Sequence, residues 1–154
     1  MTMRTEPAPA NPGWMSPRNL LIGGAAIWCA AIVAAPLLDL HRVYDFFSAI
    51  CHQNPDRSWS LAGEPLGVCI RCASIYFGFL GALAVGALPN SRLLRAALAA
   101  ALIEFLAARA GFDFAATRAA TGLFLGLAAA GFVEKGVTEL IRGRISGPFA
   151  GASQ

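Results

Sequence analysis

Four long apolar stretches, separated by short polar segments, dominate the hydrophobic pattern of the chain. Each is close to the roughly 20 residues that a helix needs to cross about 30 Å of hydrocarbon. The third is slightly short and rich in alanine. The pattern predicts an all-α, polytopic membrane protein of about four transmembrane helices, over Leu20–Leu38, Val68–Leu88, Leu93–Ala108 and Ala115–Val133.

The composition supports a lipid environment for these stretches. Of the 154 residues, 56% are hydrophobic and 14% are charged, an apolar share above the usual range of soluble domains. A soluble helical bundle is the alternative, but a chain this small cannot bury four such helices completely without lipid. A cleaved signal peptide fits poorly, because the arm before Leu20 is long, rich in proline and carries only Arg4 and Arg18 as cations.

The segments around the apolar stretches divide the chain into three parts. Residues 1–17 contain four prolines and are expected to form a disordered arm. Residues 18–140 are expected to form a single four-helix transmembrane domain, with a Cys/His loop over 39–68. Residues 141–154 are expected to form a flexible tail.

Basic residues favour a multi-pass protein of the cytoplasmic (inner) membrane with both termini in the cytoplasm. Seven lysine or arginine residues then lie inside and five lie outside or near the outer face. The bias is modest but has the expected sign. No basic tract is interleaved with aromatic residues, so nucleic-acid binding has no support. The inner residues are Arg4, Arg18, Arg92, Arg95, Lys135, Arg142 and Arg144, and the outer ones are Arg42, Arg57, Arg71, Arg109 and Arg118.

The loop after the first stretch contains a short amphipathic segment over His41–Gln53. We predict that it forms a helix on the membrane surface or extends the first helix. For His41 and Asp45, solvation explains the polar face better than a binding site does. The apolar positions are Val43, Phe46, Phe47 and Ile50, and the polar positions are His41, Asp45, Ser48 and His52.

Small residues recur every four positions in the second and fourth stretches. Such faces let helix backbones approach closely in lipid, so they are candidate surfaces for helix–helix partners. The second stretch has Gly78, Ala82 and Gly86, and the fourth has Gly122, Gly126 and Ala130.

Three ionisable residues are predicted to point into the bundle. Arg71 and Arg118 precede the first glycine of each small-residue face, and Glu104 lies among alanines in the third stretch. Since ionisable groups at membrane depth are costly and usually paired, we expect an inner ion pair of Glu104 with Arg71 or Arg118. The alternative for the arginines is that they extend to the membrane interface from near the helix ends.

The strongest candidate for chemistry is a cluster of cysteine and histidine. Cys51 and His52 precede a short loop, and Cys69 and Cys72 follow it at the start of the second stretch. Together they match a closed Cys3His site, for which zinc is favoured over iron. Adjacent Cys51 and His52 are awkward as simultaneous ligands, so His41, Asp45 or water could take the fourth position. A c-type haem is disfavoured because alanine, not histidine, follows Cys72.

Other interpretations use the same residues. A helix N-terminus and Arg71 would lower the pKa of a thiol at Cys69 or Cys72, which suits thiol–disulfide redox chemistry such as that of quinone-linked disulfide oxidases. A disulfide from Cys51 to Cys69 or Cys72 could simply close the loop. Cys29 lies within the first stretch and suits apolar packing. An accessory membrane subunit without catalytic activity is a further alternative, so enzymatic activity is left open.

Motif residues recur from the cysteine loop to the fourth stretch: Cys51-His52-Gln53, Pro55, Arg57-Ser58, Gly63, Cys69-x-Arg71-Cys72, Tyr76 and Gly78, followed by Asp113, Arg118, Thr121-Gly122 and Gly126. With these residues the chain resembles a family of small bacterial and archaeal predicted membrane proteins classed as a domain of unknown function. The resemblance covers roughly residues 40–130. Ala73 and Ser74 depart from the family pattern, in which a small residue and then glycine follow the second cysteine motif.

The resemblance implies a polytopic membrane protein and no established activity. It also joins Asp113, Arg118 and the cysteine motif into one pattern. In the four-span topology the loop from Arg109 to Arg118 lies on the side of the cysteines. Arg57, Arg71 and Arg118 around a cysteine-bound ion would then form an electropositive pocket for an anionic head group or a small acid.

Overall fold

The computed structural model describes residues 16–145. The two terminal segments, 1–15 and 146–154, lie outside the described residues, and most of the expected arm and tail falls on them. Residues 141–145, which were expected to belong to the tail, continue the last helix. Nothing in the sequence stops the helix at residue 140, because apolar and long-chain residues with good helix propensity dominate this turn.

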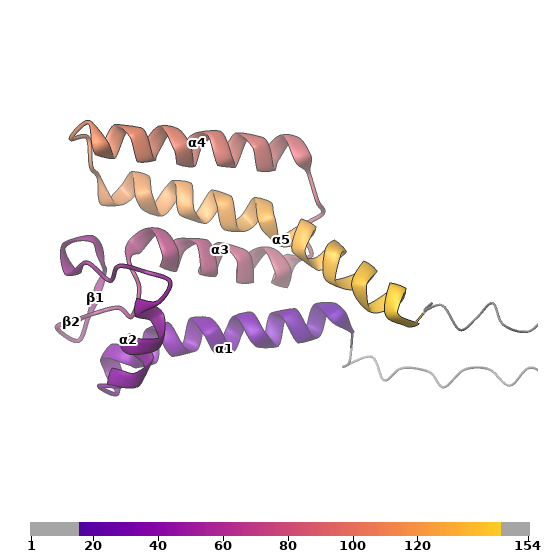
Figure 1. Ribbon diagram of the computed structural model, residues 1–154, viewed down its shortest axis with the longest axis horizontal. Coiled ribbons are helices and arrows are strands. Elements are labelled where there is room, and N and C mark those ends of the chain that lie inside the picture. Colours follow the sequence, from indigo (N-terminus) through magenta and orange to yellow (C-terminus); the bar gives the residue numbers. More distant parts are fainter. Residues whose placement is uncertain (1–15, 146–154) are drawn as a thin grey trace, which may run out of the picture.

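Four long helices lie side by side and account for most of the fold (Figure 1). They overlap the four apolar stretches of the sequence, although α5 continues beyond Val133 to Ile145, and the predicted helical fold class is confirmed. The connection between the first two long helices holds a short helix, a 3-10 turn and a two-stranded antiparallel hairpin. The long helices are α1 (Pro17–Leu37), α3 (Ile70–Val85), α4 (Ser91–Arg109) and α5 (Ala115–Ile145), and the connection contains α2 (His41–Ser48), the turn Pro55–Arg57, β1 (Ser60–Leu61) and β2 (Glu64–Pro65).

Local sequence signals set the helix ends. The Ser16 hydroxyl accepts a hydrogen bond from the Asn19 backbone N–H at the start of α1, where proline follows in the first turn. The Asn90 side chain accepts hydrogen bonds from two backbone N–H groups at the start of α4. Helix α3 ends because Gly86 adopts the left-handed conformation, with φ of 75°.

Helices α3 and α5 pack closely through glycines. A Cβ atom at Gly122 would lie 2.7 Å from the Arg71 carbonyl oxygen, and one at Gly126 would collide with the Ile75 carbonyl oxygen. Gly78 similarly lies against the backbone of Leu123. The small-residue faces predicted to be available for partners therefore pack against each other within the chain.

The prediction that Gly86 belongs to the packing face of the second stretch is wrong. It ends α3 instead of packing against α5, and its nearest neighbour is the Arg18 guanidinium. Arg18 donates hydrogen bonds to the carbonyl oxygens of Leu83 and Ala84. This contact supplies donors to carbonyl groups that the helix end leaves unpaired.

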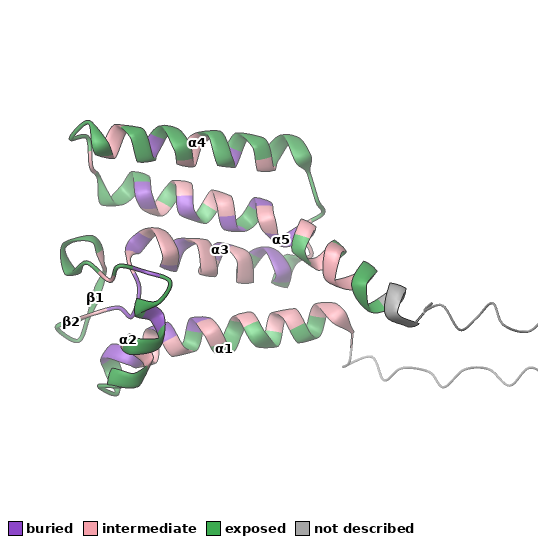
Figure 2. Ribbon diagram, in the orientation of Figure 1, coloured by how far each residue is buried: buried purple, intermediate pink, exposed green. Residues whose placement is uncertain are grey.

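Helix α4 lies at the edge of the bundle and contacts α5 (Figure 1). Its outward face is exposed in Figure 2 and carries large apolar side chains. Contiguous exposed apolar surface of this kind is unusual for soluble proteins and typical of contact with lipid or a partner. The exposed residues include Leu98, Leu102, Ile103 and Leu106.

Within residues 16–145, two helices are long and apolar enough to cross a membrane. They are α1 and the segment Ala115–Ile141 of α5. Helix α3 is apolar as well, but it has 16 residues and is shorter than the other two. The prediction of four spans therefore goes beyond what helix length and apolarity establish.

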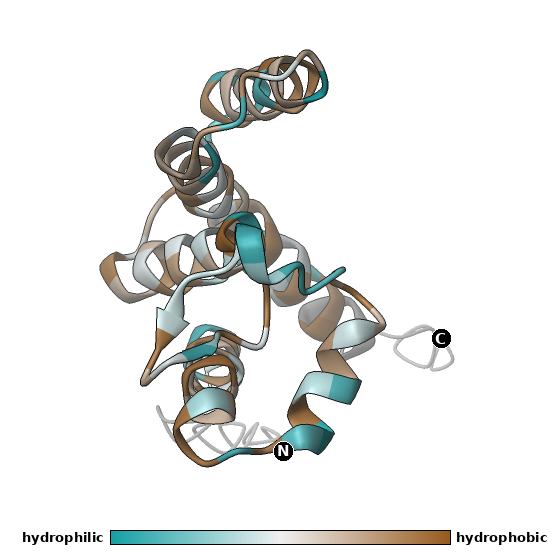
Figure 3. Cartoon of the chain, turned by 90° about the vertical axis from the view of Figure 1, so that its left-hand side faces the viewer, coloured by the Kyte–Doolittle hydropathy of each residue, from teal (hydrophilic) through white to brown (hydrophobic). Residues whose placement is uncertain are grey.

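The short elements gather at one end of the bundle. We call it the cysteine end: it comprises α2, the hairpin, Cys51, Cys69, Cys72 and the turn between α4 and α5. Figure 3 looks onto this end and shows hydrophilic residues on its short helices and loops. The start of α1 and the end of α5 lie toward the opposite end (Figure 1).

The core of the cysteine end is apolar. Phe47 of α2 is 1% exposed and packs with Ile32 of α1 and Val68 before α3. The Trp28 ring meets the rings of Phe47 and Tyr76 edge-on, with centroids 5.2 Å and 5.6 Å apart. Cys51 belongs to this core, and Cys69 and Cys72 pack against it.

Helix α2 is shorter than predicted. It ends at Ser48 instead of reaching Gln53, and the Cys51 backbone N–H donates to the Phe47 carbonyl in the turn that follows. Ile50 lies in this turn and Phe46 lies within α2, and both are more than half exposed, although the helical pattern grouped them with Phe47. The periodicity thus predicted the burial of Phe47 but not the turn that follows Ser48.

Candidate metal centre

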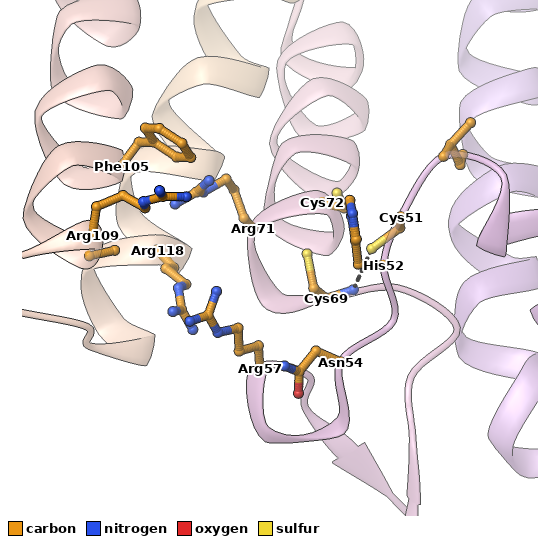
Figure 4. A pocket seen from close by; sticks show the side chains of 12 residues that line it. Cys51, His52, Asn54, Arg57, Cys69, Arg71, Cys72, Phe105, Arg109 and Arg118 are labelled. Carbon is orange, nitrogen blue, oxygen red and sulfur yellow. Dashed lines mark hydrogen bonds between the residues drawn. The ribbon is translucent and has the colours of Figure 1, made fainter. Parts of the chain in front are cut away.

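Three cysteine side chains meet at the start of α3. Cys69 is the residue that caps α3, Cys72 lies in its first turn, and Cys51 follows the turn after α2. Their sulfur atoms all lie within 4.8 Å of one another. The Cys69 backbone N–H donates a hydrogen bond of 3.2 Å to the Cys51 sulfur, as Figure 4 shows. Cys51 and Cys69, which are 18 positions apart in the sequence, are thus in direct contact.

Gln53 fastens the cysteine loop from behind. Its side-chain amide donates hydrogen bonds to the carbonyl oxygens of Tyr44 (2.7 Å) and Gly67 (2.8 Å). The Tyr44 hydroxyl donates to the Pro65 carbonyl at 2.6 Å. These bonds join α2 to the segment that leads into Cys69. The roles of Gln53 and Tyr44 were not predicted, although Gln53 belongs to the shared Cys-His-Gln motif.

The sulfur geometry fits a thiophilic metal ion. Two thiolates on a tetrahedral zinc ion, with bonds of roughly 2.3 Å, lie about 3.8 Å apart. Sulfur atoms within 4.8 Å reach this spacing by small side-chain rotations. All four cysteines of the chain have free thiols in the structure, and Cys29 is buried in α1. The three-sulfur group could therefore hold a metal ion.

The other predicted ligands lie around this group. His52 is exposed and lines the cavity next to the sulfurs, but it is not part of the three-sulfur group. The His41 side chain is 81% exposed and lies 3.6 Å from the Asp39 carboxylate. Asp45 is exposed on α2 as well. The described arrangement brings three of the four predicted metal ligands together and leaves His41 and Asp45 in solvent-facing positions.

A network of ion pairs adjoins the cysteines. Glu104 of α4 is 7% exposed; it pairs with Arg71 of α3 and lies 3.9 Å from Arg118 of α5. Asp113 pairs with Arg118 and, at 3.0 Å, with Arg57 of the cysteine loop. The expected inner ion pair of Glu104 is present. The network also places the turn between α4 and α5 on the side of the cysteines.

A cavity of about 410 Å³ opens between the cysteines and this network. Figure 4 shows Arg57 reaching from the loop toward Arg118, and Arg71 reaching toward α4. The Arg71 guanidinium lies 6.0 Å from the centre of the Phe105 ring. Arg109 was assigned only to the outer face by sequence, and the structure adds it to the wall. The lining residues are Ile50, Cys51, His52, Asn54, Arg57, Cys69, Arg71, Cys72, Phe105, Ala108, Arg109 and Arg118.

Comparison with known proteins identifies the family. An uncharacterized protein of Methanocaldococcus jannaschii is 47% identical over 38 residues, which are 25% of this chain and 24% of that relative. The match thus spans about a quarter of the relative's length. No solved structure matches. The family described as predicted membrane protein (DUF2085) matches residues 51–132, from the first cysteine of the centre to the middle of α5. The chain therefore belongs to this family of predicted membrane proteins, as its motifs indicated.

Proposed function

We propose that the protein is a four-span integral membrane protein that binds a metal ion, zinc in the first place, at the cysteine end of its bundle. Membership of a predicted membrane protein family supports the membrane assignment. The exposed apolar face of α4 supports the inclusion of this helix among the spans, since water does not favour such a surface. Helix α3 packs between the candidate spans α1 and α5.

We place the cysteine end on the outer face of the cytoplasmic membrane. The basic residues assigned to the cytoplasm outnumber those assigned to the outside by seven to five. Arg18 and Lys135 border a hollow beside the turn between α3 and α4, at the end of the bundle opposite to the cysteines. Both termini are then cytoplasmic.

The single observation that carries the metal proposal is the convergence of three cysteine sulfurs from two separate segments. Thiolates suit zinc and other soft ions, and three of them leave one coordination position in a tetrahedral site. His52 borders the same cavity and is our candidate for the fourth ligand or for a hydrogen bond to a ligand. An open fourth position would favour catalysis, and occupation by His52 would favour a structural role.

The test is metal analysis of protein purified in detergent without reductant or added metal. The comparison uses the double variant Cys69→Ser/Cys72→Ser and the control Cys29→Ala, which removes a buried thiol outside the group. We expect about one zinc per chain in the natural protein and in the control, and none in the double variant. A metal content below a tenth per chain, together with an oxidised cysteine pair, would contradict the proposal.

A second candidate function is thiol–disulfide exchange. Its support is the position of Cys69 and Cys72 at the N-terminus of α3, with Cys51 beside them. Oxidation of two of these thiols to a disulfide would release two electrons and two protons to a quinone. Titration of free thiols with and without quinone separates the candidates, since metal-bound thiolates stay shielded until a chelator is added.

A further inference from the structure

We propose that the cavity beside the cysteines binds a phosphate group, carried by a small phosphorylated molecule or by the head group of a phospholipid. This inference rests on the proposed function, because the sulfur cluster forms one wall of the same cavity. It adds the chemical class of the ligand, which the metal proposal leaves open.

The charge of the cavity wall is the first argument. Four arginines line it, from the cysteine loop, α3, α4 and α5, and no carboxylate is among the lining residues that the structure describes. Glu104 and Asp113 pair with three of these arginines but do not themselves line the cavity. Two carboxylates therefore face four guanidinium groups, and the excess positive charge is directed at the cavity. The four are Arg57, Arg71, Arg109 and Arg118.

Burial makes this excess significant. The Arg118 side chain is 8% exposed and borders the cavity. Arg71 has a buried Nε atom that donates no hydrogen bond to any described atom. Burying a cation is costly unless opposite charge and hydrogen-bond acceptors are close by. Glu104 and Asp113 supply part of this charge, and an anion in the cavity would add further negative charge and further acceptors.

The arrangement of donors favours phosphate over a simple carboxylate. Arginine N–H groups from several elements border one space, and a phosphate offers at least three acceptor oxygens in a tetrahedral arrangement. A carboxylate offers only two oxygens, which lie in one plane. The carboxylates of Glu104 and Asp113 already pair with Arg71 and Arg118 in this way. The volume of about 410 Å³ falls within the range of roughly 300–1,000 Å³ typical of small-molecule sites.

The test measures binding of inorganic phosphate and glycerol 3-phosphate to full-length protein in detergent, by calorimetry. Arg57→Gln and Arg109→Gln are the chosen variants, because both arginines are exposed, and the ion pair of the exposed Arg57 with Asp113 is expected to add little to the stability of the fold. Arg42→Gln is the matched control, since Arg42 is exposed on α2 at the same end but does not line the cavity. We expect each cavity variant to weaken binding about tenfold and the control to leave it unchanged.

A second arm identifies the source of the phosphate. Nanodiscs of phosphatidylcholine with or without phosphatidic acid are compared, with copurifying lipid measured for each variant. Saturable binding of the soluble probes supports a free phosphorylated ligand, and arginine-dependent retention of phosphatidic acid supports a head group. Absence of both, or binding that Arg57→Gln and Arg109→Gln do not weaken, would overturn the inference.

Metal content measured on the same samples separates the two proposals. Phosphate binding without bound metal would refute the metal centre and keep the anion site. Bound metal without phosphate binding would refute the anion site and keep the metal centre.

Discussion

The contact between α3 and α5 and the cysteine end are held together by different physical means. Between the two helices, glycines bring the backbones so close that a single added carbon atom meets a carbonyl oxygen. At the cysteine end, sulfurs, ion pairs and the Gln53 amide connect segments that are far apart in the chain. Steric fit thus determines how the helices assemble, and polar chemistry determines how the candidate site is shaped.

The largest effect is expected from a substitution in the helix contact. Gly126→Leu would drive a side chain into the backbone of α3 at Ile75, and overpacking of this severity has no rotamer to relieve it. We expect loss of the monodisperse peak in size-exclusion chromatography in detergent. Gly136→Leu is the control in the same helix, because nothing lies within 4 Å of its added Cβ. Equal behaviour of the two variants would show that close approach of α3 and α5 is dispensable.

The next effect concerns the ion pair that joins the two regions. Glu104→Gln keeps the shape but leaves Arg71 and Arg118 short of one negative charge. Loss of one partner of a buried pair costs about 3 kcal/mol or more, so we expect the thermal midpoint to fall by about 5–10 °C. The measurement is tryptophan fluorescence during heating. The double variant Glu104→Gln/Arg71→Gln should recover part of the loss, and a strictly additive loss would contradict a direct interaction.

Metal removal should have a smaller effect that is confined to the cysteine end. Binding to the folded state adds stability in proportion to the logarithm of metal concentration over the dissociation constant. We expect a chelator to lower the thermal midpoint of the natural protein by a few degrees, about 2–6 °C, and to leave Cys69→Ser/Cys72→Ser unchanged. An equal shift in both proteins would show that the chelator does not act through the three cysteines.

The smallest effect is expected from the support behind the sulfurs. Gln53→Ala removes two hydrogen bonds that join α2 to the segment before α3. We expect a loss of about 1 kcal/mol in the free energy of unfolding and about tenfold weaker metal binding, measured by competition with a chromogenic chelator. Ser48→Ala is the control, since its exposed hydroxyl bonds only within α2. Unchanged metal affinity in Gln53→Ala would restrict this residue to a role in folding.

The sequence alone determined the number and place of the long helices, because apolar stretches of this length are a local property of the chain. It also indicated part of the candidate site, because the paired cysteines at a helix start and the inward Glu104 follow from spacing along single elements. Cys51 and Cys69, by contrast, are connected by a loop whose path is set by the Gln53 bonds and by Phe47 in the core.

Only the tertiary structure decided how the elements share their faces. The small-residue stripes of α3 and α5 pack against each other, a pairing that no periodicity within one helix encodes. The repeat of small residues predicted Gly86 as a packing position, but Gly86 ends α3. Its left-handed backbone conformation is not specified by such a repeat. Arg109 joined the cavity for the same reason: its place depends on how α4 lies on α5, which is set by contacts between helices and not by the residues around it.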